Sequence, residues 1–292
     1  MSKYRKILSL LLLVVLPLAG CAGLSGPARN LGDTVINAEE TWSGTVRING
    51  VVTVKKGGSL TILPGTKVLF VRKDIDGDGI GDAEILVEGK LIARGTVAAP
   101  IIFSSAEEKP QPADWKYLYL DFARQADIEY IISEYAYSGI QVHFCKAKIK
   151  NSVFRHNIDG VRFSTVNIEV TGNRIYGNRH GIRYEERRSR AEVSGNDIRN
   201  NKIGIFAVTR SVDKANIHHN NIVDNDDYNA KLGIDQHHDV TLRQNWWGTT
   251  SSEKIARNFF DKKQDETLGR IRAPEPLAEP VAITLPIGIE EE

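Results

Sequence analysis

An internal repeat in the C-terminal half of the chain limits its fold more than any other feature. One copy lies within ten residues and consists of Asn173, Ile175, Asn178, Gly181 and Ile182. The same residue types return 23 residues later from Asn196, and related copies begin at Ser152, Asn220 and Asn245. Because self-similarity at a nearly fixed spacing is the signature of a repeat architecture, we expect a solenoid.

The repeat unit must be built from β-strands. A spacing of 21 to 25 residues is too short for paired helices, and the leucine pattern of leucine-rich repeats is absent. Short stretches alternate apolar and polar residues with a period of two, as at Val166, Ile168 and Val170. One turn of chain per repeat stacks each strand about 4.8 Å from its equivalent in the next turn. The sequence therefore predicts an all-β solenoid of parallel sheets.

The N-terminal half repeats this pattern more loosely, with glycine and proline at the expected corners, as in residues 60–66 and 85–92. These phrases, the Asn-x-Ile-x-x-Asn-x-x-Gly-Ile units and the segment from Asn245 to Thr249 resemble the pectate-lyase-like superfamily, including copper-maturation-type β-helix repeats. The resemblance implies a right-handed parallel β-helix of roughly nine coils over residues 41–272. Because this scaffold hosts lyases, hydrolases, adhesins and inert spacers, it leaves the activity open.

The first twenty residues have the pattern of an export signal, with three basic residues followed by an apolar run that ends at Leu16. The segment Leu-Ala-Gly-Cys that ends at Cys21 resembles the lipobox of bacterial lipoproteins, which implies cleavage before Cys21 and lipidation of that residue. An ordinary secretory signal is the alternative. Ala22 after the cysteine favours the outer membrane. We therefore expect residues 1–20 to be removed from a cell-envelope, outer-membrane lipoprotein that faces the periplasm or the outside.

Both ends of the processed chain differ in composition from the repeats. Residues 21–40 are predicted to be a lipidated, flexible tether, and residues 273–292 a tail rich in proline and glutamate that could drape over the end of the solenoid. Cleavage changes the formal charge from +1 to −2, which argues against a nucleic-acid partner. The expected partners are the membrane, through the lipid anchor, and an acidic polysaccharide or envelope protein.

The strongest ligand motif is an acidic loop in the N-terminal half. Four aspartates and a glycine form the pattern Asp-x-Asp-x-Asp-Gly-x-x-Asp, which resembles calcium loops although the following glutamate is one position early for an EF-hand. The candidate ligands are Asp74, Asp76, Asp78, Asp82 and Glu84. A structural calcium ion and a solvated acidic hairpin both remain open as interpretations.

A candidate ligand-binding face follows from the repeat register. Alternation sends the residue after each repeat glycine inward and the next residue outward, which places Arg162 beside Arg183 in adjacent turns. Two arginines so placed repel unless a carboxylate or an anionic ligand such as a uronate or phosphate meets them. A solvated ladder of charges is the alternative. The predicted face consists of Gln141, His143, Arg162, Arg183 and Glu185, with Ser164 and Phe206 beside them.

Catalysis has weaker support. Asp226 and Asp227 form a carboxylate pair that resembles the polygalacturonase-like pattern, but the Gly-His-Gly and Arg-x-Lys segments do not follow it. We also expect the acidic loop to lie at least three coils from Arg183, too far for calcium-assisted elimination. The sequence therefore favours a non-catalytic binding or scaffold module, with a polysaccharide lyase or glycoside hydrolase acting on acidic polysaccharide as the alternative.

Histidine pairs suggest a second alternative. His218-His219 and His237-His238 lie 19 residues apart, nearly one coil, so two imidazoles could approach each other and bind copper or zinc. This spacing is the basis for a metal delivery function. Histidines at surface turns, without a shared metal, are the alternative.

Overall fold

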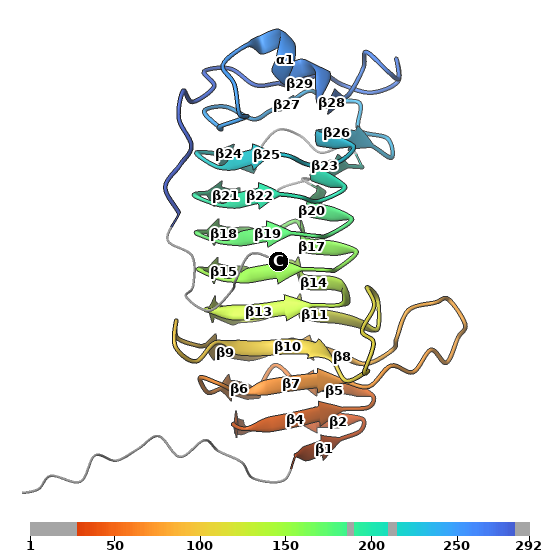
Figure 1. Ribbon diagram of the computed structural model, residues 1–292. Helices are drawn as coiled ribbons and strands as arrows, with labels where there is room; N and C mark the ends of the chain where they lie inside the picture. The colour runs from red at the N-terminus through yellow and green to blue at the C-terminus, as the bar shows by residue number, and fades with distance from the viewer. Residues whose placement is uncertain (1–27, 186–189, 210–214, 284–292) are drawn as a thin grey trace, which may run out of the picture.

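Three parallel β-sheets form the body of the molecule. The computed structural model describes residues 28–185, 190–209 and 215–283. Successive strands of the chain enter the three sheets in turn, and each sheet runs along the length of the solenoid (Figure 1). This arrangement confirms the predicted parallel β-helix.

The three sheets are named A, B and C. Sheet A contains β1 (Arg29–Leu31), β4 (Thr45–Ile48), β7 (Lys67–Phe70), β10 (Ile101–Ser105), β13 (Ile131–Glu134), β16 (Val153–Arg155), β19 (Arg174–Tyr176), β22 (Asp197–Arg199) and β25 (Asn221–Val223). Sheet B contains β2 (Thr34–Ile36), β5 (Val51–Val54), β8 (Glu84–Val87), β11 (Trp115–Asp121), β14 (Ala136–His143), β17 (Asp159–Ser164), β20 (His180–Glu185), β23 (Ile203–Val208), β26 (Tyr228–Gly233) and β28 (Phe259–Phe260). Sheet C contains β3 (Glu39–Trp42), β6 (Ser59–Ile62), β9 (Lys90–Arg94), β12 (Gln125–Glu129), β15 (Lys146–Lys150), β18 (Asn167–Thr171), β21 (Arg190–Ser194) and β24 (Ala215–His218).

The core fills the interior between the sheets with stacked branched side chains. On sheet B, Ile140, Val161, Ile182 and Ile205 pair in register from one turn to the next, and each is at most 1% exposed. Burial of such a side chain contributes about 1.5 to 3 kcal/mol. The alternation of inward apolar and outward polar residues therefore fixes which side chains reach the outer surface.

Two ladders of asparagine amides hold the corners of the solenoid. At the corner between sheets C and A, the Nδ2 of Asn173 donates to the Oδ1 of Asn196 at 2.9 Å, and Asn196 donates to Asn220 at 2.8 Å. At the corner between sheets A and B, Asn178 donates to Asn201 at 2.9 Å. These amides are almost completely buried. The repeated asparagines therefore satisfy buried polar groups between turns.

The repeat glycines are required by the close approach of neighbouring turns. A Cβ atom on Gly160 would lie 2.7 Å from the carbonyl oxygen of Gly181, and one on Gly181 would lie 2.7 Å from that of Gly204. Any side chain at these positions forces the turns apart. The glycines thus fix the register from which the outer face of sheet B is built.

The C-terminal end of the core is covered by a short helix and the following chain. Trp247 is 4% exposed and packs edge to face on Phe259 at 5.1 Å, next to helix α1 (Ser252–Arg257). Strands β27 (Val240–Thr241) and β29 (Ile271–Arg272) pair above it. Beyond them the tail turns back along the solenoid, where the backbone N–H of Val281 donates to the Oδ1 of Asn221 at 2.8 Å (Figure 1). The described part of the predicted tail is therefore packed against the repeats.

The β-helix begins earlier than the sequence suggested. Strands β1, β2 and β3 lie within residues 29–42 and supply the first strand of each sheet, although residues 21–40 were predicted to be a tether. These strands are short and mostly exposed, with Ile36 and Trp42 as their buried side chains. Because so few apolar residues are needed at the end of a stack, the alternation there was too weak to recognise. Residues 1–27, which include the predicted signal and Cys21, lie outside the described residues.

Candidate functional site

The outer face of sheet B contains the predicted ligand-binding residues in the predicted register. Gln141, Arg162, Arg183 and Phe206 are aligned from β14 to β23. His143 and Glu185 form a neighbouring column with Ser164 between them. These side chains therefore lie on one face of the sheet, as two adjacent columns.

A buried carboxylate lies beneath the two arginines. Asp159 is 0% exposed, and its Oδ2 lies 3.8 Å from Nη1 of Arg162 and 3.6 Å from Nη1 of Arg183. Its Oδ1 lies 2.6 Å from Nδ1 of His180, the aligned residue one turn further on. Asp159 thus contacts two guanidinium groups and an imidazole. The two arginines carry two positive charges and Asp159 carries one negative charge, so one positive charge is left over.

Asp159 and His180 were not identified from the sequence. Both directly precede a repeat glycine, and Ser138 and Ile203 occupy the same column in the turns before and after them. The repeat register aligns these residues with one another, but strict alternation places the residue before each glycine on the inner side, so the contact with the arginines did not follow from the sequence. The ring of His180 also stacks on Phe206 at 4.7 Å, which joins this column to the arginine column.

A tyrosine and a histidine form a second polar pair on the same face. The hydroxyl of Tyr119 lies 3.0 Å from Nδ1 of His143. Burial, followed by the charge of Asp121, raises the pKa of Tyr119 to about 12. Burial, followed by the charge of Arg162, lowers the pKa of His143 below its ordinary value of 6.5. At neutral pH the phenol is therefore protonated and the imidazole neutral, and the two share a hydrogen bond.

A cavity of about 570 Å³ opens where sheet B meets the corner with sheet A. We call it the corner cavity. Its lining includes Tyr137, His180 and Phe206, together with more basic than acidic side chains. The charged lining residues are Arg179, Arg183, Lys202, Lys231, Asp78 and Asp227. A smaller hollow of about 50 Å³ lies beside it, between Arg162, Arg183, His143 and Glu185. The predicted face thus borders a recess with an excess of positive charge.

The acidic loop lies closer to this face than we expected. Residues 71–83 connect β7 to β8 and extend away from the solenoid body, and Asp78 and Ile80 line the corner cavity together with Arg183 (Figure 1). By strand order the loop does lie at least three turns from Arg183, as predicted, since β11, β14 and β17 separate β8 from β20, but its tip reaches the same cavity. Counting coils places the strands correctly, but it ignores the distance that a long connection can cover.

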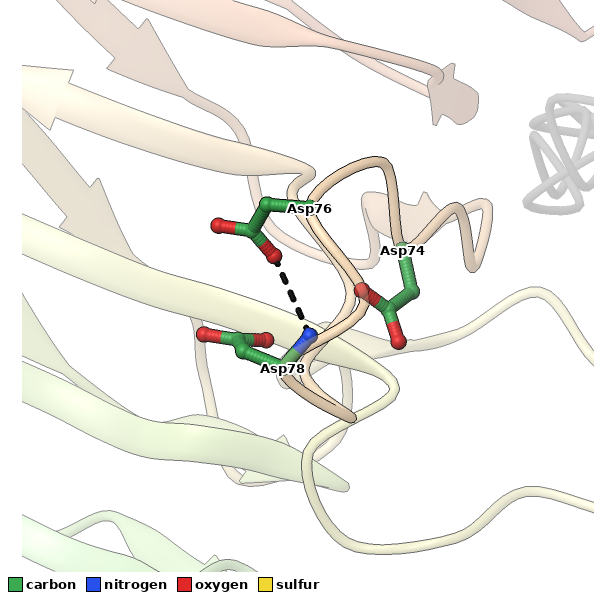
Figure 2. A group of neighbouring side chains, drawn as sticks. All are labelled: Asp74, Asp76 and Asp78. Atoms are coloured by element: carbon green, nitrogen blue, oxygen red, sulfur yellow. Dashed lines mark hydrogen bonds between the residues drawn. The ribbon is translucent and has the colours of Figure 1, made fainter.

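Three of the five predicted calcium ligands converge. Oxygen atoms of Asp74, Asp76 and Asp78 lie within 4.8 Å of one another, and all three side chains are exposed (Figure 2). Asp74 accepts hydrogen bonds from the backbone N–H groups of Gly77 and Gly79 at 2.7 and 2.9 Å, which shape the turn. Asp82 instead lies 3.6 Å from Lys116, and burial raises the pKa of the neighbouring Glu84. The arrangement offers hard oxygen donors suited to calcium.

The predicted carboxylate pair is divided by its surroundings. Asp227 lines the corner cavity and lies 3.7 Å from Nζ of Lys202, while the exposed Asp226 is not part of that lining. Asp226 and Asp227 therefore do not face the cavity together, and the second carboxylate of the lining is Asp78 of the acidic loop.

The four histidines do not form one cluster across a turn. The backbone N–H of His219 donates to the carbonyl of Gln244, so the register places Gln244 beside His219 in the next turn. His237 instead contacts the carbonyl of Thr267 at 2.6 Å. The register does not bring the two pairs together, because the turn between them spans 25 residues, six more than the histidine spacing.

A larger recess, of about 710 Å³, lies over sheet C; four basic and three acidic side chains line it, and each of the acidic ones has a basic or imidazole partner. Arg94 lies 3.1 Å from Asp127, and Nζ of Lys150 lies 2.6 Å from Glu169. His218 also contacts Glu192 there. Because the four basic and three acidic side chains nearly balance, size alone does not make this recess the better candidate site for a charged ligand.

Comparison with known families agrees with this fold. A family model described as periplasmic copper-binding protein (NosD) matches residues 104–266, and one described as pectate-lyase like beta helix domain matches residues 32–129. No curated protein and no solved structure matched the chain. Within the part of the chain that the structure describes, no helix is long and apolar enough to span a membrane.

Proposed function

Since the chain belongs to the family described as periplasmic copper-binding protein (NosD), which agrees with a location in the cell envelope, we propose that it is a lipid-anchored envelope protein that binds an acidic glycan. The binding surface is the outer face of sheet B, and the lipid anchor is Cys21, outside the described residues.

The observation that carries this proposal is the shared carboxylate. Arg162 and Arg183 are 22% and 16% exposed at their side chains, and Asp159 is the buried acid between them. A guanidinium group that is already held by one carboxylate keeps further N–H donors for a second one. The pair can therefore present a fixed, positively charged fork to the carboxylate of a uronate residue.

The charge of the corner cavity supports the same ligand class. Four basic side chains line it against two carboxylates, so an anionic ligand is attracted to the recess as a whole. Ile158, Ile203 and Phe206 supply apolar surface beside these charges. A sugar acid has both features that this lining favours, an anionic group and apolar C–H faces.

His218 and His219 bring their Nδ1 atoms within 2.7 Å of each other, but no third ligand among the described residues completes a copper site with them. The group of three or more potential ligands whose atoms converge in the described residues is the aspartate cluster, and copper prefers imidazole and sulfur donors. Cys145 is buried, and burial raises the pKa of its thiol to about 12, which disfavours the thiolate that binds metals. Copper delivery is therefore the less supported alternative. Stoichiometric copper binding that disappears in a His218→Ala/His219→Ala/His237→Ala/His238→Ala variant would establish it.

The proposal is tested by removing the positive fork. The Arg162→Gln/Arg183→Gln variant keeps polar side chains of similar length, and Lys148→Gln on sheet C is a matched control that removes a positive charge from another face. Charge-assisted hydrogen bonds contribute about 1.5 to 3 kcal/mol each, so affinity for uronate oligosaccharides should fall at least about 10-fold in the double variant. The control should bind like the parent.

Two results would contradict the proposal. The first is equal affinity of the parent and the double variant for every acidic oligosaccharide that the parent binds. The second is the release of unsaturated or reducing-end products from a uronate polymer by the pure protein, which would make the protein a lyase or a hydrolase.

A further inference from the structure

Sheet B also contains a continuous row of aromatic side chains that the arginine face does not explain. The row crosses two neighbouring turns, from the edge of the corner cavity to the corner between sheets B and C. We call it the aromatic belt. Its members are Tyr137, Tyr117, Tyr119, His143, Phe144 and Phe122.

Consecutive rings of the belt touch. Tyr137 and Tyr119 each lie edge to face on Tyr117, at centroid distances of 5.9 and 5.8 Å. Tyr119 lies edge to face on His143 at 5.3 Å. At the far end, Phe122 and Phe144 stack at 4.7 Å with nearly parallel planes. The belt is thus one connected surface.

The two phenylalanines are unusually open. Their exposed fractions are 57% for Phe122 and 52% for Phe144. Large apolar side chains that gather on a surface beside polar groups mark binding sites, because their exposure to water costs free energy in the free protein. The belt therefore has an apolar face available for a ligand.

Charged groups next to the belt limit what that ligand is. Arg162 lies two strands from Tyr119 in the same column, and its charge acts on both Tyr117 and His143. A ligand that covers the belt therefore presents apolar surface to the rings and an anionic group to the arginines, about two strand spacings or roughly 10 Å away. A purely apolar partner would match the aromatic rings but not the charged arginines.

We propose that the aromatic belt stacks against the neutral sugar rings of an acidic heteroglycan, whose uronate residues reach Arg162 and Arg183. The glycan then lies across the strands of sheet B beside the corner cavity. This inference rests on the proposed binding of an acidic glycan and adds its class, a polymer that alternates neutral and acidic sugars. The exposed C–H faces of a pyranose pack on aromatic rings, and its carboxylate pairs with guanidinium.

The test compares three groups of defined oligosaccharides: uronate homopolymers, polymers that alternate a uronate with a neutral sugar, and neutral homopolymers. The Phe122→Ala/Phe144→Ala variant removes the most open rings, which contribute little to the core. Leu63→Ala is a matched control that removes an exposed apolar side chain outside the belt. Far-ultraviolet circular dichroism of each variant confirms the fold.

The parent should bind the alternating polymers most tightly. The double phenylalanine variant should lose about 10-fold of that affinity or more and change less than about 3-fold toward uronate homopolymers, because stacking on two rings is lost. Leu63→Ala should bind like the parent. Saturation of the aromatic protons should transfer to the neutral sugar ring in nuclear magnetic resonance spectra.

Three outcomes would overturn the inference. One is a parent that binds uronate homopolymers as tightly as alternating ones, and another is unchanged binding in the phenylalanine variant; either leaves the proposed function intact. The third is binding of the parent, but not of the phenylalanine variant, to phosphatidylglycerol vesicles in the absence of glycan, which would assign the belt to a membrane surface. Failure of the parent to bind any acidic glycan contradicts the proposed function itself.

Discussion

Replacement of Asp159 by asparagine should weaken the fold and strengthen ligand binding at the same time. The carboxylate of Asp159 is the buried negative charge between Arg162 and Arg183, and the substitution keeps its size while removing that charge. A uronate carboxylate on the outer side of the guanidinium groups lies roughly 7 Å from Asp159. At an effective dielectric constant of about 20, the repulsion between the two carboxylates is about 2 kcal/mol, and salt reduces it toward about 1 kcal/mol.

The expected gain in affinity for acidic oligosaccharides is therefore about 5-fold to 30-fold. The cost appears in stability, because the contact between Asp159 and His180 is altered and two arginines lose their buried partner. Disruption of a buried ion pair costs about 3 kcal/mol or more in the free energy of unfolding.

Isothermal titration calorimetry and urea denaturation of the same samples measure both effects. Asp127→Asn is the matched control, since Asp127 lies 3.1 Å from Arg94 on sheet C and loses the same charge away from the site. A folded Asp159→Asn variant whose affinity is equal to or lower than that of the parent would refute the electrostatic reasoning. So would an equal gain in the control.

Three further predictions concern the remaining features. Millimolar calcium should raise the melting temperature of the parent. At a calcium concentration ten times the dissociation constant, the rise corresponds to about 1.4 kcal/mol of added stability. The Asp76→Asn/Asp78→Asn variant should show no such rise, and an identical shift in the variant would exclude the aspartate site. Because burial lowers the pKa of His143, the folded state binds fewer protons than the unfolded state, so the free energy of unfolding should fall as the pH drops below 6.5. His143→Gln should flatten this dependence of the free energy of unfolding on pH. An unchanged pH dependence in urea titrations of the variant would contradict this. Cys21→Ser should move the protein from the membrane fraction to the soluble fraction, and retention in the membrane would exclude a lipid anchor at Cys21.

The sequence was most informative where one turn of the solenoid constrains the next. The spacing between Asn173 and Asn196 defines the ladder, and the same register correctly aligns Gln141, Arg162, Arg183 and Phe206. This accuracy has a physical cause. Once the buried asparagine amides and the glycines of neighbouring turns are paired, the strands of those turns can stack in one register.

Features that depend on irregular segments were harder to predict. The distance that residues 71–83 cover is set by local turns and not by the repeat, so the meeting of Asp78 with the corner cavity was missed. Asp159 was overlooked because its role depends on its burial between two arginines. The two arginines belong to different turns, so the contact is not visible in the sequence of one turn. The aromatic belt joins residues of two turns outside the repeated positions, so it became visible only through their packing.

The most direct test of the account is the location of a bound uronate oligosaccharide. Chemical-shift perturbation of the labelled protein, or a crystal structure of the complex, would locate it. The account predicts changes centred on Arg162 and Arg183, on the outer face of sheet B. Changes confined to the recess over sheet C, around Lys148 and Glu169, would contradict it.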